Sequence, residues 1–303
     1  MPLAGRPRGG GGHPRDDCFR RNQGEDRRAW DYPSIVSCHG GSVALGVGVT
    51  HVPGTALAAG ALPPVPWLYP PGGLDADTVR KAAYCLYYSK DGGCGHGSAQ
   101  SIIDALAEAM PEPWGQLPPG LYRYGAGGVV GWGTICGALN GAIAVMGILG
   151  VHGALGNALI DYFCKAELPT DALVGWVPPT GVPEPLPSTV THISYSPLCH
   201  NTVSSWAATA GVPVWPLSNQ DRAKSDHCAK LVGDIVARAV ELMNDKFLRS
   251  ITPPAWTPPA SYSGCYNCHT QPGMIPSQQG KMACQACHDV PPAHGTWGKR
   301  KRN

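Results

Sequence analysis

The chain has 303 residues, of which 43% are hydrophobic, so it is long enough for one core-forming domain and a smaller appendage. Its formal net charge is only +2, and charged residues make up 15% of the sequence. These values exclude a general electrostatic attraction to nucleic acid or to an anionic membrane surface. We therefore expect no nucleic acid among its partners.

Residues 1–60 are expected to form a flexible N-terminus that carries a candidate export signal. A charged region is followed by a short apolar stretch at 40–49 and by small residues at 55–59, which is the order of an export signal. Paired arginines at 20–21 and 27–28 favour the twin-arginine type. These pairs lie far from the apolar stretch, so an ordinary flexible extension is the alternative. An export signal predicts a periplasmic or otherwise extracytoplasmic protein.

Downstream of residue 60, proline-rich connectors separate stretches in which apolar residues recur at helical spacing. No stretch shows the alternation of a strand. We therefore expect a mostly α protein, with a helical cysteine-rich domain over 61–250 and a small irregular domain over 251–303. Ser225 or Asp226 is expected to cap the last helix. Helices are predicted over 98–110, 155–168, 202–210 and 227–248.

The segment from Tyr124 to Ile160 has no charged residue apart from a histidine, and it could be read as a membrane span. Glycine recurs throughout this segment, which lowers its transfer hydrophobicity. A stripe of glycines four residues apart lets another helix approach closely, in a soluble core as well as in a membrane. We expect a buried helix over 134–150 and no membrane span in the mature protein.

The C-terminal region contains two copies of Cys-x-x-Cys-His. In such a motif the two thiols form thioethers with the vinyl groups of a c-type haem, and the histidine binds the iron from one face. The motifs predict two haems per chain, with covalent attachment at Cys265, Cys268, Cys284 and Cys287 and axial ligands His269 and His288.

Zinc is the main alternative, because the same cysteines have the C-x2-C-x15-C-x2-C spacing of a four-thiolate ribbon. Disulfides are a third reading. Neither alternative requires a histidine directly after each cysteine pair, so both leave the histidines unexplained. Few large apolar residues occur over 254–303, and two porphyrins would supply the missing core.

Each haem iron has a second axial position, for which the sequence offers several candidates. His294 follows the second motif closely, and His192 and His200 come from the preceding domain. Met274 and Met282 are further candidates. Two histidine ligands favour a low-potential electron carrier, whereas a methionine raises the potential.

Four other cysteines are predicted to lie at the starts of helices. A helix N-terminus lowers the pKa of a thiol, and four thiolates could converge on an Fe–S cluster or another metal. Disulfides or unrelated core thiols are the alternatives. Cys85 and Cys164 fall inside helices and are expected to be buried small hydrophobic residues. The four cysteines are Cys94, Cys136, Cys199 and Cys228.

These residues also carry a family resemblance, which covers about 61–290. Cys94 is followed by the block from Gly133 to Gly141, with Cys136, Gly137 and Ala138 in its middle, and then by Cys199 and Cys228. This pattern is similar to a redox-active family defined by such a cysteine–glycine block. Together with the two haem motifs, it resembles the split-Soret cytochromes c. The stretches 168–171 and 197–200 are also similar to that group.

The resemblance implies a periplasmic homodimer in which each subunit carries two closely stacked haems with histidine on both faces. It also implies a cysteine-bound Fe–S centre in the helical domain. The function that we expect is electron transfer to redox partner proteins. A reductase that acts on a small substrate at the cysteine centre or at an open haem is the alternative, and a structural zinc-binding protein is another.

Overall fold

The computed structural model describes residues 62–187, 190–211, 222–257 and 281–282. The candidate export signal, both haem-attachment motifs and His294 lie outside these ranges. The described residues are helical and contain no β-strand, only two isolated antiparallel bridges, Ile135 with Leu198 and Leu168 with His192. The prediction of a mostly α protein is confirmed.

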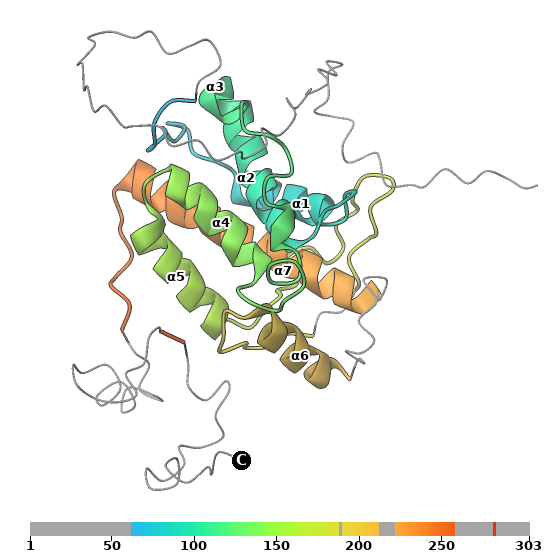
Figure 1. The fold of residues 1–303 in the computed structure, drawn as a ribbon. Helices are drawn as coiled ribbons and strands as arrows, with labels where there is room; N and C mark the ends of the chain where they lie inside the picture. The colour runs from blue at the N-terminus through green and yellow to red at the C-terminus, as the bar shows by residue number, and fades with distance from the viewer. Residues whose placement is uncertain (1–61, 188–189, 212–221, 258–280, 283–303) are drawn as a thin grey trace, which may run out of the picture.

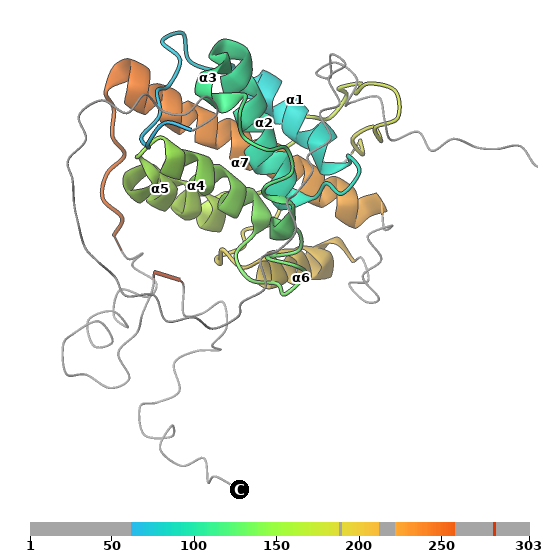
Figure 2. The ribbon, with the colours of Figure 1, turned by 45° about the horizontal axis from the view of Figure 1, so that its top comes forward.

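The helices form a bundle around one long central helix, α7 (Figure 1). Both views show α6 at one end of this bundle (Figures 1 and 2). The elements are α1 (Ala76–Tyr87), α2 (Cys94–Ala109), α3 (Pro111–Trp114), the 3-10 helix η1 (Arg123–Gly125), α4 (Gly137–Ile148), α5 (His152–Lys165), α6 (Cys199–Ala210) and α7 (Arg222–Arg249).

The core lies where α1, α2, α4 and α5 pack against α7 and against one another. Ile102 and Leu106 of α2 have no exposed surface, and neither do Leu139 and Met146 of α4 or Ile235 of α7. Removal of this apolar surface from water is the main stabilising term of the fold. The helical spacing of apolar residues in the sequence therefore predicts the buried faces of α2 and α7 correctly.

Four helices (α2, α5, α6 and α7) begin three to five residues earlier than the sequence predicts. α2 begins at Cys94 and not at residue 98, and its first turn includes glycines that lie against other backbone. A Cβ on Gly97 would lie 3.0 Å from the carbonyl oxygen of Ala83. α7 begins at Arg222, so Ser225 and Asp226 lie inside the helix and do not cap it.

The predicted buried helix over 134–150 is α4, which is shorter, at 12 residues. Its centre is buried between α2 and α5, in agreement with a core position. Among the residues that the structure describes, no helix combines the length and the apolar character needed to cross a membrane.

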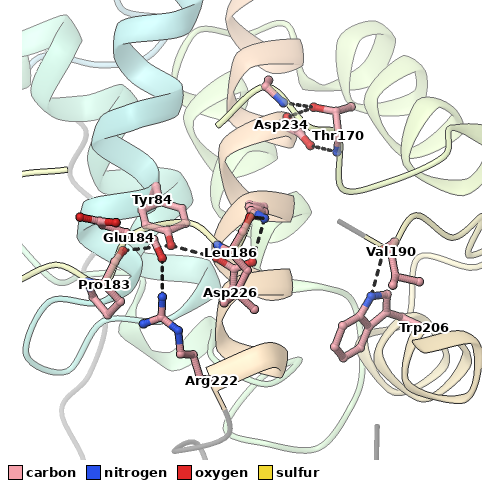
Figure 3. Close-up of polar contacts among 12 residues, drawn as sticks. Tyr84, Thr170, Pro183, Glu184, Leu186, Val190, Trp206, Arg222, Asp226 and Asp234 are labelled. Carbon is pink, nitrogen blue, oxygen red and sulfur yellow. Dashed lines mark hydrogen bonds and ion pairs between the residues drawn. The ribbon is translucent and has the colours of Figure 1, made fainter. Parts of the chain in front are cut away.

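The long connection between α5 and α6 is fixed to α7 by buried polar contacts (Figure 3). The carboxylate of Asp234 accepts hydrogen bonds from the backbone N–H of Thr170 at 2.6 Å and from its hydroxyl at 2.8 Å. Farther along, the carboxylate of Asp226 accepts from the backbone N–H of Leu186 and from the Tyr84 hydroxyl, each at 3.0 Å. These contacts set the path of the segment that leads to the start of α6.

Candidate redox centre

Four buried cysteines come from four different helices at the end of the bundle where α6 lies. Cys94 is the first residue of α2, Cys136 is the N-cap of α4, and Cys199 is the first residue of α6. Cys228 lies in the second turn of α7, because that helix begins at Arg222. The prediction of four helix starts therefore holds for three of the cysteines and is wrong for Cys228. All four side chains are less than a tenth exposed.

A short antiparallel pairing brings Cys136 and Cys199 together. The N–H of Cys136 donates to the carbonyl of Pro197 at 2.8 Å, and the N–H of Cys199 donates to the carbonyl of Thr134 at 2.7 Å. The bridge between Ile135 and Leu198 lies between these two bonds. The helices α4 and α6 thus both begin at one pair of extended segments.

Glycines allow α2 to approach α4 at this end. A Cβ on Gly137 would lie 2.6 Å from the backbone nitrogen of Gly95 and 2.8 Å from the Cβ of Cys94, and it would also meet the carbonyl oxygen of Gly125. No side chain larger than hydrogen fits there, since such distances are far inside van der Waals contact. The glycine after Cys136 is therefore required for the close approach of the Cys94 helix.

Gly137→Ala is expected to lower the free energy of unfolding by about 1–3 kcal/mol, because backbone atoms must move to admit the methyl group. Gly147→Ala in the same helix is the matched control, since a Cβ at Gly147 meets nothing within 4 Å. The control is expected to be neutral or to stabilise by up to about 1 kcal/mol through helix propensity. Denaturant unfolding measures both, and equal effects of the two variants would contradict the close packing.

The four thiols interact with one another electrostatically. The pKa of Cys94 is raised well above its usual value, first by hydrogen bonds with the Cys136 and Cys228 side chains and then by burial. Burial raises the pKa of Cys199, and charge on Cys136 and Cys228 raises it further. The pKa of Cys228 is lowered, because its sulfur accepts a hydrogen bond from Cys94. Cys136 and Cys228 thus lie close enough to act on both Cys94 and Cys199.

The convergent sulfurs form no disulfide, since every cysteine of the described ranges is a free thiol. Within those ranges, no three His, Cys, Asp or Glu side chains are arranged as ligands of a single metal ion. An Fe–S cluster differs from a single ion because its thiolates are distributed over two or more iron atoms, so they need not all lie within reach of one metal. Buried thiolates are the donors that clusters and other soft metals prefer.

Cys85 and Cys164 do not belong to this group. Cys85 is buried inside α1. Cys164 is half-buried near the end of α5, and burial raises its pKa to about 12, with Asp161 and Lys165 as the charges that act on it. Neither residue lies at a helix start, and the charged groups that act on Cys164 are not other cysteines.

The histidines proposed as second haem ligands differ in their surroundings. The Nε2 atom of His192 is buried and has no hydrogen-bond partner, and burial lowers the pKa of this imidazole. His200 is exposed on α6, and its backbone N–H donates to the carbonyl of Gly133 at 3.0 Å.

Two further buried histidines were not found by sequence reasoning. His96 and His227 are 1% and 3% exposed, and both ring nitrogens of each have no hydrogen-bond partner. The ring of His227 stacks on Trp206, with centroids 4.1 Å apart. Burial lowers the pKa of His96 to about 4 and that of His227 to about 3. The sequence signal that could have identified them was their position. His96 lies two residues after Cys94, and His227 lies directly before Cys228.

The residues just before the second haem motif lie against this end of the bundle. The Ser196 hydroxyl donates to the sulfur of Met282 at 3.5 Å. The Lys281 ammonium donates to the Asn157 side chain at 2.8 Å and lies over the Trp256 ring. Ser196 is three residues before Cys199, so the contact lies close to the cysteine group.

Comparisons with known proteins agree with this arrangement. Residues 97–242 match the model of a family described as "Putative redox-active protein (C_GCAxxG_C_C)". The split-Soret cytochrome c of Desulfovibrio desulfuricans is 31% identical over 228 residues, which cover 72% of this chain and 76% of the relative. A solved structure of that cytochrome is described as having a novel iron centre, and it matches this chain with a TM-score of 0.61 and 28% identity. The match covers 78% of this chain and 93% of the chain in that structure.

These likenesses confirm the resemblance inferred from the cysteine pattern, and they extend over most of the chain. All three comparisons indicate a redox protein that takes part in electron transfer. The chain belongs to the split-Soret cytochrome c family.

Proposed function

We propose that this protein is an extracytoplasmic dihaem c-type cytochrome that carries electrons and holds an additional Fe–S cluster in its helical domain. The four converging thiols of Cys94, Cys136, Cys199 and Cys228 are the observation that carries the proposal. The proposal includes a domain boundary near residue 250, between the helical part and the dihaem part. The novel iron centre of the related cytochrome supports the presence of iron in this chain.

The residues present fit a cluster in two respects. Their donors are sulfur atoms, which bind iron as thiolates. Burial excludes water from them, and the glycines at 95 and 137 keep the surrounding backbone close.

The haems are proposed to attach at Cys265 and Cys268 and at Cys284 and Cys287. His269 and His288 would bind the irons from one face. For the opposite face the described residues favour His192 over His200, because the Nε2 of His192 is buried without a partner and His200 is exposed. His294 remains the candidate within the C-terminal region.

The contact between Ser196 and Met282 supports electron exchange between the two kinds of centre. Cys284 follows Met282 by two residues, so at most about 7 Å of extended chain separates their Cα atoms. Ser196 accepts a hydrogen bond from the N–H of Leu198 at 3.2 Å, and Leu198 is bonded to Cys199. A short path of covalent and hydrogen bonds thus runs from Cys199 to Met282.

When bound, the haems and the cluster supply reversible one-electron chemistry. The chain's own residues bind these groups, exclude water and fix their separation. No acid, base or nucleophile is needed for outer-sphere transfer. A substrate-binding reductase would need an open coordination position on a haem or on the cysteine centre.

A homodimer in the periplasm completes the proposal. Several large apolar side chains are exposed, among them Trp132 at 83% and Leu68 at 72%. Apolar side chains exposed singly are common on monomers, so the dimer is proposed from the family resemblance. Light scattering of the mature protein tests the dimer, and a monomer at all accessible concentrations would contradict it.

Haem attachment is tested by the visible spectrum of protein expressed together with a haem-attachment apparatus. We expect a reduced α-band of the c type and a red colour that survives extraction with acidic acetone, because thioether bonds hold the porphyrin. Iron and sulfide analysis of the same sample is expected to give at least two irons beyond the haem iron. A colourless protein that holds zinc would contradict the proposal.

A further inference from the structure

We infer that Met282 is a positioning residue, which together with Lys281 docks the chain before the second haem-attachment motif on the helical domain and so fixes the distance over which electrons pass to the cysteine centre. The sulfur of Met282 is then an anchor and not the second axial ligand of a haem. The inference rests on the proposed function, because a fixed distance matters only if both centres are present.

The anchor point of Met282 is a buried and well-held part of the chain before α6. Ser196 has no exposed surface, and its hydroxyl donates to the Met282 sulfur at 3.5 Å. The direction of this bond is set, because the same oxygen accepts a hydrogen bond from the N–H of Leu198 at 3.2 Å. The carbonyl of Ser196 accepts from the Ser194 hydroxyl at 2.6 Å. Met282 therefore contacts a site that the helical domain itself holds in place.

Lys281, drawn with Met282 as the short red segment in Figure 1, adds contacts on other elements. Its ammonium donates to the Oδ1 atom of Asn157 in α5 at 2.8 Å and lies 5.4 Å from the centroid of the Trp256 ring. The amide nitrogen of Asn157 donates to the carbonyl of Gly153, so the amide oxygen faces the lysine. Lys281 is exposed, and each of its contacts is weak when taken alone. Together the two residues contact α5, the segment before α6 and the segment after α7.

This clamp of Lys281 and Met282 lies between the two kinds of proposed centre. Ser196 precedes Pro197, whose carbonyl accepts the N–H of Cys136 at 2.8 Å. On the other side, Cys284 follows Met282 by two residues. A short stretch of chain therefore joins the clamp to a proposed cluster ligand on one side and to a proposed haem-attachment residue on the other. Because the rate of electron transfer falls steeply with distance, release of the clamp would slow the transfer.

A thioether suits this anchor better than an aliphatic side chain of the same size. A buried donor that has no acceptor costs more free energy than an ordinary hydrogen bond contributes. The sulfur of Met282 accepts the proton of the buried Ser196 hydroxyl, and its unbranched side chain adapts to the site. To bind an iron, the sulfur would have to leave this hydroxyl. The contact therefore favours the anchor role and leaves the axial position to a histidine.

The docked state is tested by the rate at which trypsin cleaves the holoprotein after Lys281, with the fragments identified by mass spectrometry. The protease binds the lysine side chain, so cleavage follows the population in which Lys281 is released. Loss of one hydrogen bond is expected to raise this rate about fivefold in Ser196→Ala and in Asn157→Ala, which leave the cleaved sequence unchanged. Thr209→Ala removes an exposed hydroxyl of α6 and is expected to have no effect. Cleavage after Arg238, in the middle of α7, reports any general loosening of the fold.

Met282→Leu separates anchoring from iron binding, because leucine keeps the volume and removes the acceptor. The haem midpoint potentials are expected to equal those of the wild-type holoprotein, whereas replacement of a methionine ligand would lower one of them. After photoreduction, one electron passes from a reduced haem to the oxidised iron centre. We expect this internal step to slow about twofold or more in the variant, since the docked population falls.

Three results would overturn the clamp. They are equal cleavage after Lys281 in wild type, Ser196→Ala and Asn157→Ala, a lowered haem potential in Met282→Leu, and an unchanged internal rate in that variant. A wild-type protein without haem or without non-haem iron would instead overturn the proposed function, while the cleavage rates would still report the docking. The two failures are therefore distinguishable.

Discussion

Lys230→Met is expected to lower the free energy of unfolding by about 3–5 kcal/mol, because it leaves a carboxylate buried without its counter-charge. The ammonium of Lys230 lies 2.9 Å from the Asp226 carboxylate, and their side chains are 1% and 5% exposed. The same ammonium donates to the carbonyl of Leu186 at 2.8 Å. Denaturant unfolding at neutral pH measures the loss.

The matched control lies on the same helix. Arg249 forms an ion pair with Asp245 at 2.9 Å, but the two side chains are 70% and 30% exposed. Arg249→Met is expected to cost less than about 1 kcal/mol, since solvent screens an exposed pair. Adding Asp226→Asn to Lys230→Met should recover part of the lost stability by removing the buried charge. Equal losses for the two methionine variants would show that the buried pair carries no special weight.

This ion pair also bears on the redox centre. Asp226 and Lys230 flank Cys228 on α7, and the same network holds the connection that leads to α6 and Cys199. Loss of the pair is therefore expected to loosen the spacing between two of the four sulfurs as well as to destabilise the fold.

The second large effect is expected from Cys136→Ser. Cys136 is 2% exposed and stands at the start of α4, among the other three sulfurs. A serine hydroxyl is a much poorer ligand for iron than a thiolate, so the variant should lose its non-haem iron and its acid-labile sulfide. The two proposed haems should remain, because their attachment would use other cysteines.

Cys164→Ser is the control for this experiment. That cysteine is half-buried in α5, outside the convergent group, and should be replaceable without loss of non-haem iron. Metal analysis of the two variants beside the wild-type protein gives the answer. Retention of the full iron content by Cys136→Ser would refute its assignment as a ligand.

Local patterns were sufficient to predict most of the helices. The apolar spacing that contains Ile102 and Leu106 identifies the buried face of α2, and α7 follows the same logic. Helix starts were predicted less well. Asp226 resembles a cap in sequence, but in the fold this residue lies inside α7. Its carboxylate pairs with the Lys230 ammonium and accepts a hydrogen bond from the N–H of Leu186.

The candidate site could be predicted only as a set of residues and not as an arrangement. That the sulfurs converge depends on the long-range bridge between Ile135 and Leu198 and on the contact of Gly137 with Gly95. Such contacts leave no periodic signal in a single sequence.

Electron exchange within one chain is the central claim, and flash reduction tests it most directly. A photoexcited flavin reduces the haems of the fully oxidised holoprotein within the flash, and haem absorbance is then followed. We predict a later phase in which some haem is reoxidised as the iron centre is reduced, with a rate that does not depend on protein concentration. A single haem signal with no internal phase, beside an iron centre that stays oxidised although its potential is higher, would contradict this claim.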